Sequence, residues 1–229
     1  MLEVKNISKT FNLGTVNEKQ ALRGLSLTLK DGDFVTVIGG NGAGKSTLLN
    51  AIAGTWMVDE GRILIDGQDV TKLPEYRRAK FLGRVFQDPM NGTAATMGIE
   101  ENLALAFRRG DRRTLKNGIN NNERKMYREL LAKLGLGLEN RMTSKVGLLS
   151  GGQRQALTLL MATLKKPKLL LLDEHTAALD PKTAAKVLET TETIVNQDRL
   201  TTLMITHNMK DAIHIGNRLI MMSDGQIIY

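Results

Sequence analysis

The sequence predicts an α/β fold with a core of parallel strands, an N-terminal antiparallel β subdomain and an inserted α-helical subdomain. Three observations predict it: alternating segments near the N-terminus, dense apolar runs followed by helical segments, and a middle region without strand-like runs. The 229 residues are 41% hydrophobic, with 22 glycines and 4 prolines. This is the composition of an ordinary globular chain, and it excludes fibrous and disordered classes.

The first part of the chain has the pattern of half-buried antiparallel strands. Apolar and polar residues alternate over 2–7 and again over 25–29. A denser apolar run, 34–38, then precedes a glycine-rich turn and a helix-forming segment over 45–53. Because a strand, a tight turn and a helix follow one another, a parallel β–α unit is expected there.

Two further dense apolar runs, 169–172 and 203–205, predict central strands of the same parallel sheet. The helix between them is expected to begin at Pro181, because proline is favoured at the first helical position. Near the C-terminus, 218–222 and 226–229 flank a Ser-Asp-Gly turn and predict a hairpin.

The middle of the chain predicts a helical lobe, since 100–107 and 122–134 have helical character on either side of an Asn-rich loop. We therefore expect a single domain over 1–229, with the core and its β subdomain over about 1–87 and 150–229 and the helical subdomain over about 88–149.

The sequence contains no cysteine, which excludes a disulfide scaffold, thiolate catalysis and a Cys-ligated zinc. It has neither the layout of a signal peptide nor an apolar run of the roughly 18 to 20 residues that span a bilayer. A reducing, cytosolic setting is expected, in which any membrane role is indirect.

A glycine-rich loop gives the strongest chemical signal, because it matches G-x-x-x-x-G-K-[ST] between a predicted strand and a predicted helix. Its backbone N–H groups are expected to form an anion nest at the start of the helix. Lys45 would bring a charge to the β- and γ-phosphates, and Ser46 a hydroxyl to Mg²⁺. The loop consists of Gly39, Gly40, Asn41, Gly42, Ala43, Gly44, Lys45, Ser46 and Thr47.

Two carboxylates follow the run at 169–172, at the end of a strand where open α/β sheets bind ligands. Asp173 is placed to hold Mg²⁺, directly or through water, and Glu174 to orient and deprotonate an attacking water. The alternative is a solvated acidic turn.

A third element, Leu149-Ser150-Gly151-Gly152-Gln153, precedes apolar residues at helical spacing. Ser150 has the character of an N-cap, and the small Gly151 and Gly152 would let a phosphate approach the helix start. The segment is either an ordinary capped helix or part of a nucleotide site on another copy of the chain.

Taken together, GGNGAGKST, LSGGQ and LLLLDE occur in an order that closely resembles the nucleotide-binding subunit of an ABC transporter. Gln87, the Ala-Leu-Asp ending at Asp180, and His207 extend the resemblance over essentially the whole chain. It implies a P-loop NTPase core and, from GGNGAGKST and DEHTAALDP, a stand-alone bacterial importer cassette near the branched-chain amino-acid group.

The resemblance also implies roles at a shared site. Two cassettes would face head to tail, so that Ser150 and Gly152 of one chain contact the γ-phosphate held by Lys45 of the other. Gln87 would lie beside Mg²⁺ and the attacking water, with its loop meeting the membrane partner.

Three further roles are implied in the same way. His207 would hydrogen-bond the γ-phosphate, Asp180 would cross the dimer interface, and Phe11 would stack on adenine where Tyr is commoner. Taken alone, Phe11 could be a core residue and His207 a strand end. The sequence departs from the family pattern at His175, where Pro is usual, and at Asn208, where Asp is frequent.

The resemblance implies an ATPase that uses ATP and Mg²⁺ to energise solute transport, most simply uptake of a small solute such as an amino acid. Its expected partners are a second ATP-binding subunit, most simply in a homodimer, transmembrane permease subunits and an extracytoplasmic substrate-binding protein, at the cytoplasmic face of the membrane. The alternatives are an ABC-type ATPase acting on ribosomes or DNA, and an exporter or extraction cassette.

The unusual feature of the composition is its net charge, which is +8 at pH 7 because 32 Lys and Arg residues stand against 24 Asp and Glu residues. Residues 108–128 contain eight bases and two acids, and so carry +6 of that total. Aromatic residues are nearly absent there, so we expect no nucleic-acid partner but a basic lobe near anionic lipid, the alternative being a solvated loop. Neutralising four bases is then expected to weaken membrane or permease association more than ATP binding: Arg108, Arg109, Arg112 and Arg113.

Overall fold

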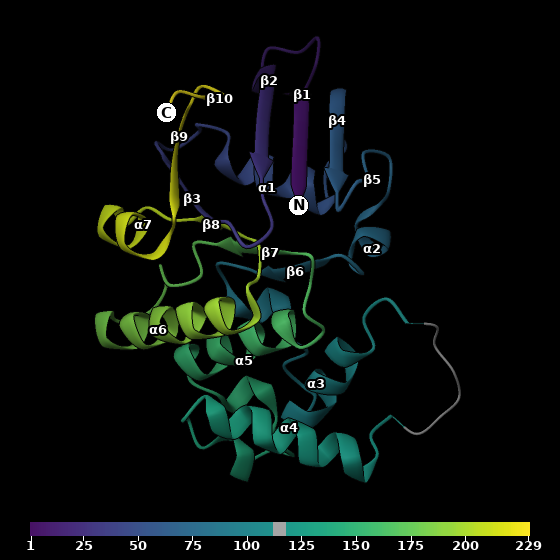
Figure 1. The fold of residues 1–229 in the computed structure, drawn as a ribbon, viewed down its shortest axis with the longest axis vertical. Coiled ribbons are helices and arrows are strands. Elements are labelled where there is room, and N and C mark those ends of the chain that lie inside the picture. Colours follow the sequence, from purple (N-terminus) through teal and green to yellow (C-terminus); the bar gives the residue numbers. More distant parts are fainter. Residues whose placement is uncertain (112–117) are drawn as a thin grey trace.

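Two β-sheets of different kinds organise the computed structural model, which describes residues 1–111 and 118–229 (Figure 1). The first sheet is antiparallel and has the strand order β2-β1-β4-β5. Alternating burial along β1 and β2 places one face of this sheet on the core, as predicted from the alternating sequence. Its strands are β1 (Leu2–Phe11), β2 (Lys19–Leu29), β4 (Glu60–Ile65) and β5 (Gln68–Asp69).

The second sheet has the order β10-β9-β3-β8-β7-β6. All its neighbouring strands are parallel except β10 and β9, which pair antiparallel at one edge. The three dense apolar runs form its centre, and they are buried on both faces as expected for parallel strands. Its strands are β3 (Phe34–Gly39), β6 (Leu82–Val85), β7 (Leu169–Asp173), β8 (Thr202–Ile205), β9 (Arg218–Ser223) and β10 (Gln226–Ile227).

Helices lie on both sides of the parallel sheet (Figure 1). α1 lies between the two sheets, whereas α3 and α4 form a lobe at the opposite end of the molecule, with α5 and α6 between that lobe and the parallel sheet. The helices are α1 (Lys45–Ala53), α2 (Glu75–Arg78), α3 (Ile99–Phe107), α4 (Asn121–Lys133), α5 (Gly151–Thr163), α6 (Pro181–Asp198) and α7 (Met209–Ile215).

α5 joins the lobe to the parallel sheet. Leu157 and Leu160 pack in the apolar cluster of α3 and α4, while Leu159 and Ala162 pack in the cluster under β7 and β8. The segment Leu149-Ser150-Gly151-Gly152-Gln153 at the start of α5, called the signature segment below, is thereby fixed to both parts of the molecule.

Within the described residues, no helix has both the length and the apolar character that a bilayer crossing requires.

Candidate functional site

The glycine-rich loop links β3 to α1, as the sequence predicts. Gly44 immediately precedes α1 with φ 99°, and a Cβ there would lie 2.6 Å from the carbonyl oxygen of Ala21. Only glycine tolerates both this backbone conformation and this close approach. Lys45 Nζ donates to the carbonyls of Gly39, at 2.9 Å, and Gly40, at 3.1 Å, so the buried ammonium bridges the start of the loop.

A cavity of about 430 Å³ opens over this loop. Phe11 lies in its wall, and its ring meets Trp56 edge-on with centroids 4.8 Å apart. The structure thus places the aromatic side chain expected to stack on adenine beside the expected phosphate loop. The lining residues are Phe11, Lys19, Ala21, Asn41, Gly42, Ala43, Gly44, Lys45, Ser46, Thr47, Glu174 and His207.

Asp173 and Glu174 stand at the carboxyl end of β7. Burial raises the pKa of Asp173, and the nearby guanidinium of Arg84, whose Nη2 lies 3.9 Å from Asp173 Oδ2, opposes this shift. Glu174 has a positive φ of 45°, which is uncommon for a residue with a side chain. Its Oε1 lies 2.6 Å from His207 Nε2, so the structure brings together two of the predicted catalytic residues.

The residues present fit a magnesium–nucleotide complex. The loop N–H groups and Lys45 would supply positive charge to phosphates. The exposed Ser46 hydroxyl and the Asp173 carboxylate, which does not line the cavity but lies close enough to Lys45 to feel its charge, are the hard oxygen ligands that Mg²⁺ prefers. The half-exposed imidazole of His207 lies at the rim, where it can donate to an anion.

The signature segment begins α5, away from that cavity. Ser150 Oγ accepts from Gln153 N at 3.3 Å, and Gln153 Oε1 accepts from Ser150 N at 3.2 Å, which forms a capping box. The predicted N-cap is therefore confirmed. Ser150, Gly152 and Gln153 line a second cavity, between α5 and α6, and a Cβ at Gly152 would collide with the Thr183 side chain. Gly151 is exposed.

Gln87 and Asp180 also lie outside the phosphate cavity. Asp180 caps α6 by accepting from Thr183 N at 3.1 Å, and its hydrogen bonds from Thr183 lower its pKa. Gln87 is exposed just after β6, where Gln155 Nε2 of α5 donates to the carbonyl of Phe86 at 3.2 Å.

The two departures from the family pattern have structural roles. His175 is buried, its Nε2 lies 3.1 Å from Thr191 Oγ1 of α6, and burial lowers its pKa to about 4. It is therefore neutral at physiological pH and anchors the segment after Glu174. Asn208 caps α7 by accepting from Lys210 N at 3.0 Å.

Three bases of 108–128 make contacts within the molecule, while the expected association of this lobe with anionic lipid stays a prediction. Arg108 pairs with Glu123 at 2.9 Å and Arg124 with Glu100 at 2.8 Å, while Arg109 Nη2 donates to the Ala162 carbonyl at 3.0 Å and burial lowers its pKa. These contacts fix the lobe internally. Arg112, Arg113 and Lys116 lie outside the described residues.

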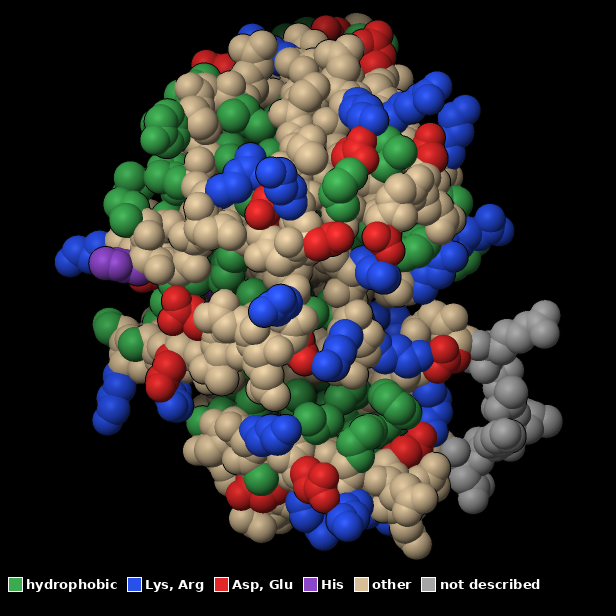
Figure 2. Space-filling model, in the orientation of Figure 1, with side chains coloured by type: hydrophobic (Ala, Val, Ile, Leu, Met, Phe, Trp, Pro, Cys, Tyr) green, Lys and Arg blue, Asp and Glu red, His purple; other side chains and the backbone are tan. Residues whose placement is uncertain are grey.

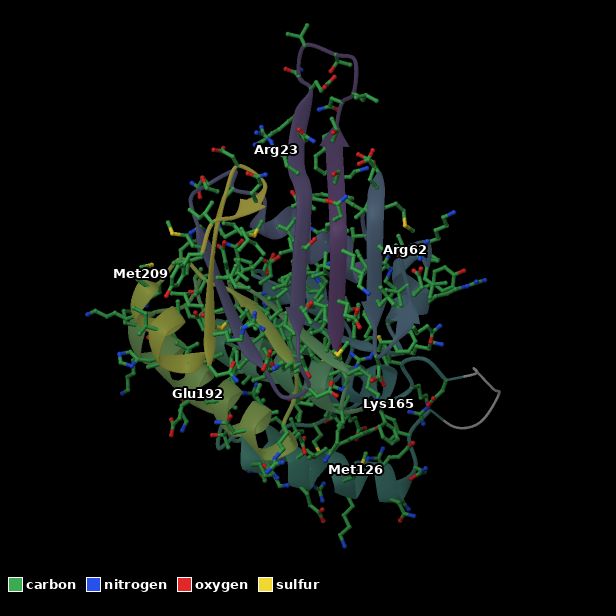
Figure 3. All side chains as sticks on the ribbon, turned by 45° about the horizontal axis from the view of Figure 1, so that its top comes forward. Arg23, Arg62, Met126, Lys165, Glu192 and Met209 are labelled. Carbon is green, nitrogen blue, oxygen red and sulfur yellow. The ribbon has the colours of Figure 1, made fainter. Side chains whose placement is uncertain are left out.

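The surrounding surface shows the same intermingling of charge. Figure 2 shows basic and acidic side chains interspersed over one face of the molecule. Lys165, labelled in Figure 3, follows α5 and pairs with Asp111 at the edge of the lobe. The net charge of this region therefore does not measure how many basic side chains are available to bind an anionic partner.

Three residues of the site were not predicted from the sequence: Arg84 beside Asp173, Trp56 against Phe11, and Lys19 in the cavity wall. None belongs to a motif, because each is brought in by strand register or by packing. Only the alignment of β1 against β2, which pairs Phe11 with Lys19, could have indicated the last of them.

Comparisons with known proteins identify the family of the chain. Residues 22–177 match the ABC transporter family. The chain is 46% identical over 228 residues to the tyrosine transport ATP-binding protein of Clostridioides difficile (strain R20291), covering 100% of this chain and 90% of that protein. It is 36% identical over 231 residues to methionine import ATP-binding protein MetN 2 of Enterococcus faecalis (strain ATCC 700802 / V583), covering 100% and 64% respectively.

A solved structure gives the same result for the fold. The dimeric, post-hydrolysis state of the ATP-binding cassette MJ0796 bound to ADP and Pi matches with a TM-score of 0.85 and 30% identity, covering 100% of this chain and 97% of that one. The family match spans the phosphate loop, the signature segment and the acidic pair. The chain therefore belongs to the ABC transporter family and is an ATP-binding cassette, an ABC-type ATPase.

Proposed function

We propose that the chain is the ATP-hydrolysing subunit of an ABC importer, which energises a separate membrane permease. The observation that carries this is the convergence of Lys45, Glu174 and His207 on one cavity. In this proposal the loop N–H groups and Lys45 hold the phosphates, while Ser46, Gln87 and Asp173 hold Mg²⁺. Catalysis is then mainly positioning and electrostatic stabilisation.

Three side chains act on the water and the transferred phosphoryl group. Glu174 accepts the proton of the attacking water, Gln87 positions that water, and His207 donates to the γ-phosphate. The 2.6 Å contact between Glu174 and His207 supports this assignment, because it holds the carboxylate at the cavity rim.

A second copy of the chain completes the site. Ser150, Gly151, Gly152 and Gln153 of that copy approach the γ-phosphate, and Asp180 crosses the interface. Two features support this: the signature segment lines a different cavity from Lys45 of its own chain, and the matching cassette MJ0796 is described as dimeric. A helix start with free N–H groups is suited to a phosphate brought by the partner.

The transported solute is an amino acid, with an aromatic one favoured. The 46% identity to a tyrosine transport protein and the 36% identity to a methionine import protein support this choice over ribosome- or DNA-directed ATPases and over exporters. The implied partners are transmembrane permease subunits and an extracytoplasmic substrate-binding protein. The subunit then lies at the cytoplasmic face of the membrane.

The test is uptake of radiolabelled tyrosine by cells in which the gene is deleted and then restored. Restoration of the wild-type chain is expected to restore uptake, and restoration of Lys45→Ala is not. Retention of the purified chain by a permease rather than by ribosomes or DNA at physiological salt is the matching biochemical result. Normal tyrosine and methionine uptake in the deletion strain would exclude the proposed solute class.

A further inference from the structure

Lys19, which belongs to none of the motifs, faces the nucleotide cavity. It begins β2 and pairs directly with Phe11 across the antiparallel β1–β2 ladder. Side chains that stand opposite each other in such a ladder share one face of the sheet. Phe11 and Lys19 accordingly line the same cavity as the phosphate loop.

The Lys19 ammonium lies over the backbone of that loop. A Cβ added to Gly42, which has φ 81°, would stand 3.2 Å from Lys19 Nζ. The contact of Gly44 with the carbonyl of Ala21 holds β2 against the loop at a second point. The Lys19 charge is thus positioned by the fold beside N–H groups of a kind that bind phosphate.

Within the described residues, the Lys19 ammonium also forms no ion pair, whereas two other lysines near the cavity have partners. Lys9 is bound to Asp59 at 2.7 Å, and Lys45 is 5% exposed and donates to two loop carbonyls. Over residues 1–111 and 118–229, no carboxylate lies within 4.0 Å of Lys19 Nζ. A lysine that is aimed at an anion nest and lacks a carboxylate partner suits an anionic ligand.

We propose that Lys19 is a second cation for the polyphosphate of the bound nucleotide, contacting its oxygens on the Phe11 side of the cavity. The inference rests on the proposed function only in requiring that a nucleotide occupies this cavity. One strand pair then recognises both ends of the ligand: Phe11 contacts the base, and Lys19, across the ladder, contacts the phosphates.

The chain supplies its own probe for the test. It contains a single tryptophan, and Trp56 packs edge-on against Phe11, so its fluorescence is expected to respond when a base stacks there. Titrations with MgATP, MgADP and adenosine then separate phosphate recognition from base recognition. Lys30→Met is the matched control, because it removes the same charge from an exposed position immediately after the far end of β2.

In Lys19→Met, the Kd values of MgATP and MgADP are expected to rise about tenfold, as for loss of one partly exposed charge-assisted hydrogen bond, while that of adenosine stays unchanged. Lys19→Arg should bind nearly as the wild type does, and Lys30→Met should match the wild type. Unchanged MgATP binding by Lys19→Met, or an equal loss for adenosine, would overturn the inference. Failure of the wild-type chain to bind MgATP would instead overturn the proposed function.

Discussion

At the scale of single residues, Glu174 is held in a strained position at the point where the acidic pair leaves β7. Its backbone N–H donates to the Ile205 carbonyl at 3.0 Å, and its carboxylate meets His207. A positive φ at a residue with a side chain costs roughly 1–3 kcal/mol and persists where the surroundings enforce it. The strain fits a group that must be aimed at a reacting water.

Glu174→Gln is therefore expected to lower ATP turnover by about 100-fold or more, because the amide cannot accept a proton. MgATP affinity should stay within about twofold, since Lys45 and the loop are untouched. Phosphate release and equilibrium binding measure the two quantities. Glu192→Gln on α6 (Figure 3) makes the same chemical change outside the cavity and should leave both unchanged. Near-normal turnover in Glu174→Gln would remove Glu174 from the catalytic role.

His175 predicts a pH dependence of stability rather than of catalysis. Burial lowers its folded pKa from 6.5 to about 4, so the unfolded chain binds a proton more readily between these values. The free energy of unfolding is therefore unaffected by this group above pH 6.5. It decreases as the pH falls from 6.5 toward 4, by up to about 1.4 kcal/mol per pH unit. Urea unfolding at several pH values should show a shallower acid slope in His175→Asn. An identical slope would contradict the assignment.

At the scale of elements, a buried arginine ties the end of α1 to α2. Arg78 is fully buried and donates to the carbonyls of Ala51, at 2.7 Å, and Ile52, at 2.9 Å, in the last turn of α1. It also donates to Leu73 O at 2.7 Å. Burial lowers its pKa to about 10, which leaves it charged at neutral pH. The helix that begins at the phosphate loop is thus anchored at its other end.

Arg78→Met is expected to reduce the free energy of unfolding by about 2–4 kcal/mol, because it leaves several buried carbonyls without donors. Denaturant unfolding measures this. The adjacent, exposed Arg77 gives the control, and Arg77→Met should change stability by less than about 0.5 kcal/mol. Equal effects of the two substitutions would show that the buried network carries no particular stability.

The elements that could be predicted from the sequence are those whose own residues determine them. The run Phe34–Ile38, the loop after it and the helix 45–53 carry a complete local signal, and Pro181 does begin α6. By contrast, β4 and β6 were not predicted from the sequence. β6 contains Gly83 and Arg84 and is a strand because it pairs with β7, which no local pattern reveals.

The same distinction applies to the site. The phosphate loop and the acidic pair could be predicted, because each is a short segment with its chemistry in sequence order. Lys19 and Arg84 could not, since strand register and packing bring them in from elsewhere. Nor could the count of charges over 108–128 reveal that the partly buried guanidinium of Arg109 donates to the Ala162 carbonyl of α5.

At the scale of the whole molecule, the two segments that the proposed function brings together at one nucleotide line separate cavities of a single chain. Lys45 and Glu174 line one cavity, while Ser150 and Gly152 line another between α5 and α6. α5 is packed on both the lobe and the parallel sheet, so its start moves only with larger parts of the fold. Two chains in head-to-tail contact would bring the two segments together over the nucleotide.

The most direct test of this account is the mass of Glu174→Gln in solution with and without MgATP, measured by light scattering. The variant is expected to change from a 25.3 kDa monomer to a dimer of twice that mass when MgATP is added. Gly151→Asp in the same background should bind MgATP and stay monomeric, because this exposed position accommodates a Cβ, 3.3 Å from Leu179 Cδ2, and its carboxylate would face the γ-phosphate. A variant that stays monomeric when saturated with MgATP, or full ATPase activity from a strictly monomeric wild-type chain, would contradict the shared site.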